Sequence, residues 1–181
     1  MIDNYHSPCS NFSVCLIGHL MSIKSPLLKP APDSTHSAFS IAGHPIHAML
    51  VSFPVAFTLA GLASDLAYWW TGDVFWARVS LWMIGAAFIM GSLAGLAGTL
   101  DFMMVHKIRR HVASWNHFIA AVMLISLLAA NWWYRVNDHE AAVLPWGLFM
   151  SAVSALSLSV VGWFGGKLVF HHNIGTDSEE T

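Results

Sequence analysis

The stretch that decides the fold runs from Val74 to Val105 and reads VFWARVSLWMIGAAFIMGSLAGLAGTLDFMMV. It contains one Arg and one Asp, and it is longer than the roughly 20 apolar residues that cross the hydrocarbon core of a bilayer as a helix. Three further stretches have the same character, and they cover about 44–70, 112–134 and 144–170. The sequence therefore predicts four membrane-spanning helices.

The composition of the whole chain agrees with a membrane protein. Of its 181 residues, 56% are hydrophobic and only 10% are charged, whereas a soluble domain carries about 25% charged residues. The net charge is -2 and no basic stripe is present, so nucleic-acid binding is excluded. No hydrolase or transferase motif is found, which leaves enzymatic activity open and makes a stand-alone enzyme the less favoured interpretation.

The short connections between the spans indicate how the helices are arranged. Consecutive spans must run antiparallel, so we expect an all-α, up-down-up-down four-helix bundle. We assign residues 41–175 to this transmembrane domain, 1–40 to a flexible arm and 176–181 to an acidic tail. Because Met21 begins a segment that resembles an ordinary start, we expect residues 1–20 to be absent from the natural protein or unstructured.

Aromatic and basic residues predict the orientation in the membrane. Tryptophans flank the first and third connections, as in interfacial aromatic belts. The opposite face carries Lys24, Lys29, Lys107, Arg109, Arg110 and Lys167, against Arg78 and Arg135 on the aromatic side. The positive-inside rule then places the chain in the cytoplasmic (inner) membrane with both termini in the cytoplasm.

Small residues in the second span indicate close helix contacts. Gly91, Gly95 and Gly98 form a small-xxx-small pattern, which lets a neighbouring backbone approach closely. That neighbour is either another helix of the same bundle or a second copy of the chain in a homodimer. No internal repeat is evident, which argues mildly against an inverted-repeat transporter.

Ionisable residues within the spans need a partner or a purpose, because each one is costly in a bilayer. His47 and Asp65 are 18 residues apart, as are His117 and Arg135, and 18 residues make five turns of helix, so each pair shares one face. We expect Asp65 to form an ion pair with Arg135, or with Arg78 across the first turn. A proton or ion path that uses Asp65 is the alternative.

Histidines gather at the predicted cytoplasmic face, and several of them come from different spans. Opposed imidazoles at one depth are what a b-type haem or a transition-metal site in a bundle core requires. His47 and His117 are the preferred pair for haem. A metal site would instead draw on His44, His47, His117 and His172, with Asp101 as an oxygen ligand or hydrogen-bond acceptor. A third possibility is that these histidines only cap helices and pack.

Two motifs resemble a known family. Gly43-His44-Pro45-Ile46-His47 opens the first span, and Gly165-Gly166-Lys167-Leu168-Val169-Phe170 with His172 closes the last. Over about residues 40–175 the chain resembles the bacterial membrane proteins catalogued as domain of unknown function 2231. The resemblance implies a four-span protein without an established activity, and it carries over His44, His47, His117 and His172. Some members are joined to Rieske-type iron–sulfur domains, which implies redox work.

Together these observations predict an electron-transfer subunit. Its histidine cluster would hold haem b or a metal and exchange electrons with a partner such as an iron–sulfur protein. The alternatives are a structural or assembly subunit of a membrane complex without a cofactor, and a small ion or metal carrier that uses Asp65 and Asp101.

Overall fold

The computed structural model describes residues 40–41, 44–110 and 112–172. The predicted arm, except for its last residue, and the predicted acidic tail lie outside the described residues. So do the side chains at positions 44, 45, 107, 171 and 172.

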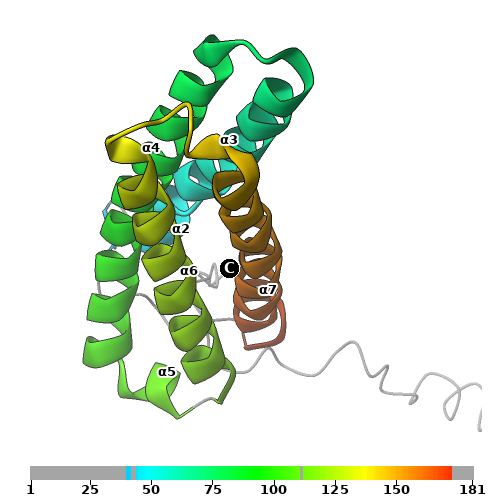
Figure 1. The fold of residues 1–181 in the computed structure, drawn as a ribbon. Coiled ribbons are helices and arrows are strands. Elements are labelled where there is room, and N and C mark those ends of the chain that lie inside the picture. The colour runs from blue at the N-terminus through cyan, green and yellow to red at the C-terminus, as the bar shows by residue number, and fades with distance from the viewer. Residues whose placement is uncertain (1–39, 42–43, 111, 173–181) are drawn as a thin grey trace, which may run out of the picture. The chain divides into compact units, whose positions relative to one another are not determined.

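Four long helices alternate in direction (Figure 1), and they confirm the predicted all-α four-helix bundle. They are α3 (Ser52–Thr71), α4 (Val74–Met104), α6 (Val112–Val136) and α7 (Leu148–His172). The shorter elements are the paired strands β1 (Ser40–Ile41) and β2 (His44–Pro45), the helices α2 (Ile46–Leu50) and α5 (His106–Arg109), and a π-helical turn, η2 (Val143–Gly147). Four segments are long and apolar enough to cross a membrane, namely Ile46–Thr71, Val74–Met104, Val112–Val136 and Val143–Phe170.

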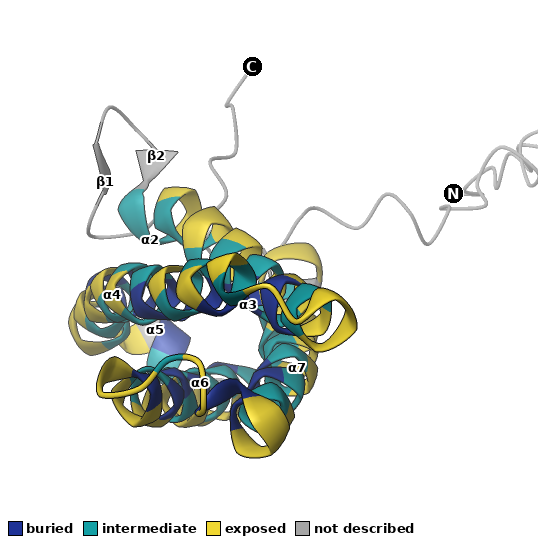
Figure 2. Cartoon of the chain, turned by 45° about the horizontal axis from the view of Figure 1, so that its top comes forward, coloured by how far each residue is buried: buried dark blue, intermediate teal, exposed yellow. Residues whose placement is uncertain are grey.

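The long helices are arranged around a square in the order α3, α4, α6, α7 (Figure 2). Helix α3 packs against α4 and α7, and α6 packs against the same two helices. Helices α3 and α6 are therefore diagonal partners, as are α4 and α7. We call the end with the α3–α4 and α6–α7 connections the turn end, and the opposite end, with α5, the α5 end.

The first connection is the Thr71-Gly72-Asp73 turn. Gly72 has a left-handed φ of 69°, and its N–H donates to the carbonyl oxygen of Tyr68, which is how a glycine usually ends a helix. The Asp73 carboxylate accepts a 2.9 Å hydrogen bond from the N–H of Phe75, so it caps the start of α4. Local chemistry alone thus reverses the chain within three residues.

Prolines interrupt the first and last spans. Helix α2 begins at Ile46, directly after Pro45, and ends at Leu50, because Pro54 has no N–H to donate to the Leu50 carbonyl. Leu144 is extended, with φ -113° and ψ 135°, as is usual for a residue that precedes a proline. The last span therefore starts with η2, and α7 follows it.

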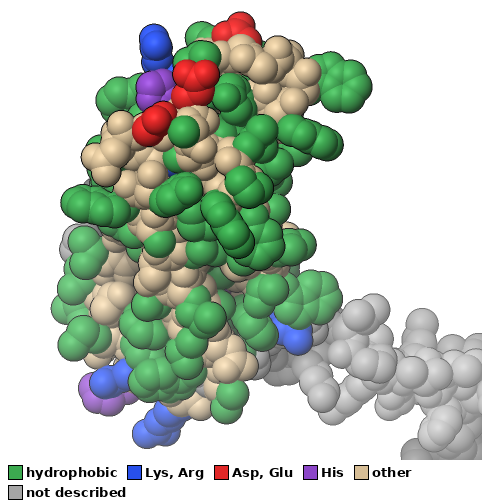
Figure 3. Space-filling view, in the orientation of Figure 1, with side chains coloured by type: hydrophobic (Ala, Val, Ile, Leu, Met, Phe, Trp, Pro, Cys, Tyr) green, Lys and Arg blue, Asp and Glu red, His purple; other side chains and the backbone are tan. Residues whose placement is uncertain are grey.

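The interior is built from small and aliphatic side chains. Ile84, Ala87, Leu124 and Leu128 form the buried core cluster. On the face shown in Figure 3, hydrophobic side chains cover much of the middle of the bundle, whereas Lys, Arg, Asp, Glu and His lie toward its two ends. This distribution is the one that a bilayer requires.

The small-residue face of α4 is covered by other segments of the same chain. A Cβ added at Gly91 would lie 3.6 Å from Pro54, one at Gly95 would lie 3.0 Å from Ile125, and one at Gly98 would lie 2.9 Å from the His47 ring. A homodimer contact through these glycines would have to share the face with those side chains.

Candidate functional site

Two polar sites lie inside the bundle, one toward each end. The site toward the turn end is an ion pair between Asp65 of α3 and Arg135 of α6, both 0% exposed. Nη1 and Nη2 of Arg135 donate to the two carboxylate oxygens of Asp65 at 2.7 and 2.8 Å. This bidentate geometry is the strongest form of a carboxylate–guanidinium contact. The structure thus joins two diagonal helices at the centre of the bundle.

The other donors of the guanidinium are also satisfied. Nε of Arg135 donates to Asn131 Oδ1 at 2.8 Å, Nη1 to Ser80 Oγ at 2.9 Å, and Nη2 to Ser151 Oγ at 3.1 Å. All five N–H groups of the arginine therefore have an acceptor. Ser80 belongs to α4 and Ser151 to α7, so each of the four long helices contributes to one network.

A glycine makes room for the guanidinium. A Cβ at Gly147, in η2, would clash with the Ala142 carbonyl oxygen and would also lie 2.7 Å from Nη2 of Arg135, so any side chain there would displace the main chain as well as the arginine. Arg78, the alternative partner of Asp65, is exposed on α4 instead. Both oxygens of Asp65 are occupied by Arg135, and Ser80 also donates to one of them at 2.5 Å. The network therefore has the properties of a structural clamp.

The site toward the α5 end is formed by His47 of α2 and His117 of α6. Their ring centroids are 6.3 Å apart, and the ring planes are nearly perpendicular, at 85°. His47 Nδ1 lies 2.7 Å from the carbonyl oxygen of Ala94, and His117 Nδ1 lies 3.1 Å from that of Val161. Because a carbonyl oxygen can only accept, both Nδ1 atoms carry hydrogen, and in the neutral rings both Nε2 atoms keep a lone pair.

Each of these histidines rests against a glycine of the neighbouring helix. A Cβ added at Gly98 would lie 2.9 Å from His47 Nδ1, and one at Gly165 would lie 3.2 Å from His117 Cε1. Each glycine stands four residues after the carbonyl that its histidine contacts, at Ala94 and Val161. The missing side chain leaves that carbonyl accessible, so the glycines position the rings.

A buried hydroxyl lies next to the histidine pair. Ser114 is 3% exposed and stands three residues before His117 on α6, which places the two on neighbouring positions of one helix face. Among the residues that the structure describes, Ser114 Oγ is one of two buried side-chain polar atoms without a hydrogen-bond partner. Asp101 is 8% exposed and stands three residues after Gly98 on α4. The surroundings of the pair are therefore partly polar.

The remaining predicted ligands are not brought to this site by any described contact. His44 lies in β2 and His172 is the last residue of α7, and the side chains of both lie outside what the structure describes. Within the described ranges 40–41, 44–110 and 112–172, no group of three or more His, Cys, Asp or Glu side chains could hold a metal ion. The described donor set consists of two imidazoles.

The two sites reveal a repeat that the sequence hides. His117 follows His47 by 70 positions, and Arg135 follows Asp65 by the same 70. In each half, a histidine at the start of a hairpin contacts a carbonyl of the returning helix, and that helix supplies a serine to Arg135. The α3–α4 and α6–α7 hairpins run in the same direction around the square, so they are related by an approximate two-fold axis along the bundle. Both polar pairs consist of equivalent positions.

Sequence reasoning missed several residues of these sites. Ser80, Gly147 and Ser151 were not among the residues that the sequence indicated for these sites. The repeated 18-residue spacing from histidine to charge was the signal that could have revealed the two halves.

Comparison with known proteins identifies one family. The profile of the family described as "Predicted membrane protein (DUF2231)" matches residues 43–178. No curated protein and no solved structure matches the chain. The match contains every residue of both sites.

Proposed function

The chain belongs to the predicted membrane proteins of domain of unknown function 2231, and from this premise we propose that it is an electron-transfer subunit in which His47 and His117 hold the iron of a haem b. The observation that carries the proposal is that both Nδ1 atoms are bonded to main-chain carbonyls, at Ala94 and Val161. A histidine ligand generally has its second nitrogen fixed in this way, because the contact sets the tautomer and the ring orientation.

The separation of the rings also supports a shared ion. Centroids 6.3 Å apart are compatible with one ion bonded to a nitrogen of each ring at about 2 Å. The approximate two-fold relation makes the two ligands equivalent. In addition, the unpaired hydroxyl of Ser114 indicates that a polar group is missing from its surroundings.

The number of protein ligands favours haem over a mononuclear metal. A transition-metal site normally takes three or four protein ligands, whereas haem iron receives four nitrogens from its own macrocycle and needs only axial groups from the protein. The described residues offer two imidazoles and no larger ligand group. The side chains of His44 and His172 lie outside what the structure describes, so a metal site that includes them is decided by the experiment below.

The chain's own residues would bind and orient the group. Gly98 and Gly165 would set the position of each ring, and both rings are half-buried among the helices. When bound, haem b supplies one-electron chemistry. We place the site at the cytoplasmic side of the inner membrane, with both termini in the cytoplasm, because the α5 end carries Arg109 and Arg110. An iron–sulfur protein is the proposed redox partner.

The ion-carrier alternative finds less support in the geometry. A carrier needs a carboxylate that can exchange its partner, but Asp65 is fully buried and bound by Arg135 in a bidentate pair. In the assembly-subunit alternative, the lone pairs on the two Nε2 atoms have no function. The following experiment separates this alternative from the proposal.

The test is the visible absorption spectrum of protein produced with a haem precursor and purified in detergent. We expect a Soret band that disappears in His47→Ala and in His117→Ala. His106→Ala is the matched control, since His106 is exposed at the same end, and it should keep the band, as His172→Ala should keep most of it. Gly98→Ala should reduce haem content while the helices remain folded by circular dichroism.

A colourless wild-type protein would overturn the haem proposal. If that protein were also free of metal and as heat-stable with His47→Ala as without it, the histidines would have only a packing role. Metal content that falls in all four of His44→Ala, His47→Ala, His117→Ala and His172→Ala would instead assign a mononuclear metal site.

A further inference from the structure

A hollow on the outer surface of α7 lies apart from both interior sites. It measures about 260 Å³ and is lined by Gly162, Trp163, Gly166, Lys167 and Phe170. A Cβ added at Gly162 would meet no atom within 4 Å, and one at Gly166 would meet only the Phe170 ring, at 4.0 Å. The two glycines thus remove the side chains that would otherwise fill this strip of the helix surface.

The hollow combines an apolar floor with a single positive charge. Trp163 is 67% exposed and Phe170 is 84% exposed, and the Lys167 ammonium lies 5.4 Å from the centre of the Trp163 ring. Lys167 is the only charged residue between Val143 and Phe170. An aromatic wall holding a cation at the edge of an apolar strip fits a molecule with an anionic head and a hydrocarbon chain.

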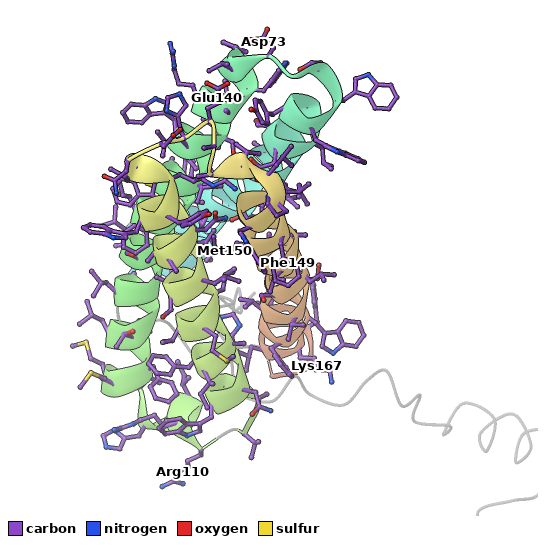
Figure 4. The ribbon with its side chains drawn as sticks, in the orientation of Figure 1. Asp73, Arg110, Glu140, Phe149, Met150 and Lys167 are labelled. Atoms are coloured by element: carbon purple, nitrogen blue, oxygen red, sulfur yellow. The ribbon has the colours of Figure 1, made fainter. Side chains whose placement is uncertain are left out.

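Lys167 stands three residues before the end of the candidate span Val143–Phe170, where we expect its ammonium to reach the lipid headgroups. Lys167 and Arg110 lie toward the same end of the molecule (Figure 4), where charged side chains replace the apolar surface (Figure 3). A phosphate at this level can therefore reach the ammonium while an acyl chain extends toward the middle of the membrane over Gly162 and Gly166.

We propose that this hollow binds an anionic phospholipid, with its phosphate on Lys167 and an acyl chain along the Gly162–Gly166 strip beside Trp163. Charge decides against a second copy of the chain, although two glycines four residues apart also suit helix dimers. In a symmetric contact through this face, Lys167 would approach the same lysine of the partner, and like charges at an interface are unfavourable.

Native mass spectrometry of the full chain, released from detergent, tests the proposal with phosphatidylglycerol and phosphatidylcholine of identical acyl chains. We expect wild-type protein to retain the anionic lipid about fivefold more than the zwitterionic one, the effect of one lysine at a membrane surface. Lys167→Gln should abolish this preference. Gly162→Leu should lower retention of both lipids, because its side chain occupies the hollow.

Arg78→Gln is the control, since Arg78 is an exposed cation near the turn end, away from Lys167, and it should leave lipid retention unchanged. Equal melting temperatures of the variants establish that the bundle is intact, and Trp163→Ala replaces Gly162→Leu if the latter fails to fold. An unaltered preference in Lys167→Gln, or an equal loss in Arg78→Gln, would overturn the proposal. So would a dimer of the wild type that Gly162→Leu dissociates, because the hollow would then belong to a second copy.

Discussion

Removing the negative charge of Asp65 tests the clamp directly. Asp65→Asn keeps the shape of the side chain, but the amide can accept from only one of the two Arg135 nitrogens and turns an N–H₂ group toward the other. One charge-assisted hydrogen bond is lost, the other keeps its charged donor but loses its anionic acceptor, and the Ser80 hydroxyl loses its carboxylate acceptor. With both partners 0% exposed, we expect a loss of about 3–5 kcal/mol in the free energy of unfolding.

Reversible unfolding in mixed micelles, followed by circular dichroism, measures this loss. Arg135→Gln in the Asp65→Asn background should restore about 1–2 kcal/mol, since it removes the unpaired cation. Arg78→Gln alone should leave the free energy of unfolding unchanged. A loss below about 1 kcal/mol for Asp65→Asn would refute the reasoning. If transport of an ion were abolished at the same time, Asp65 would be part of an ion path.

Two further predictions concern packing and orientation. Gly147→Ala should destabilise the bundle by about 1–3 kcal/mol in the same assay, because the new methyl group would clash with the Ala142 carbonyl oxygen and would lie 2.7 Å from Nη2 of Arg135. Gly162→Ala, which meets nothing within 4 Å, should change stability by far less, and equal effects would contradict the role given to Gly147. Single cysteines at positions 73 and 110 should react with a membrane-impermeant thiol reagent from the periplasm and the cytoplasm respectively, and labelling of position 110 from the periplasm would reverse the topology.

The sequence was sufficient for the spans and for the relations within each helix. Length and apolar content identify the four segments, and the family match confirms the resemblance. A helical spacing of 18 residues places His117 and Arg135 on one face of α6, and the same spacing relates His47 of α2 to Asp65 of α3. Sequence also indicates the first turn, because glycine and aspartate have specific roles at helix ends.

Relations between helices could not be obtained in this way. Periodicity does not give the rotation of one helix against another, so it could not show that Ser80 and Ser151 turn toward the same arginine. His47 and His117 donate to main-chain carbonyls, and every residue has such a carbonyl, so the sequence does not show which ones are used. The glycine four residues after each acceptor is the one indication. The break before Pro145 was missed because the apolar run continues through it.

The approximate two-fold relation has a consequence for which halves of the chain can associate. At the equivalent positions on the axis, the first hairpin carries an acid and the second carries a base. Two copies of the first hairpin would place carboxylate against carboxylate, and two copies of the second would place guanidinium against guanidinium. In the buried interior of the bundle, water would hydrate neither charge. Only one hairpin of each kind gives a neutral interior. Because the two hairpins carry opposite charges at equivalent positions, each hairpin can pair with the other but not with a copy of itself.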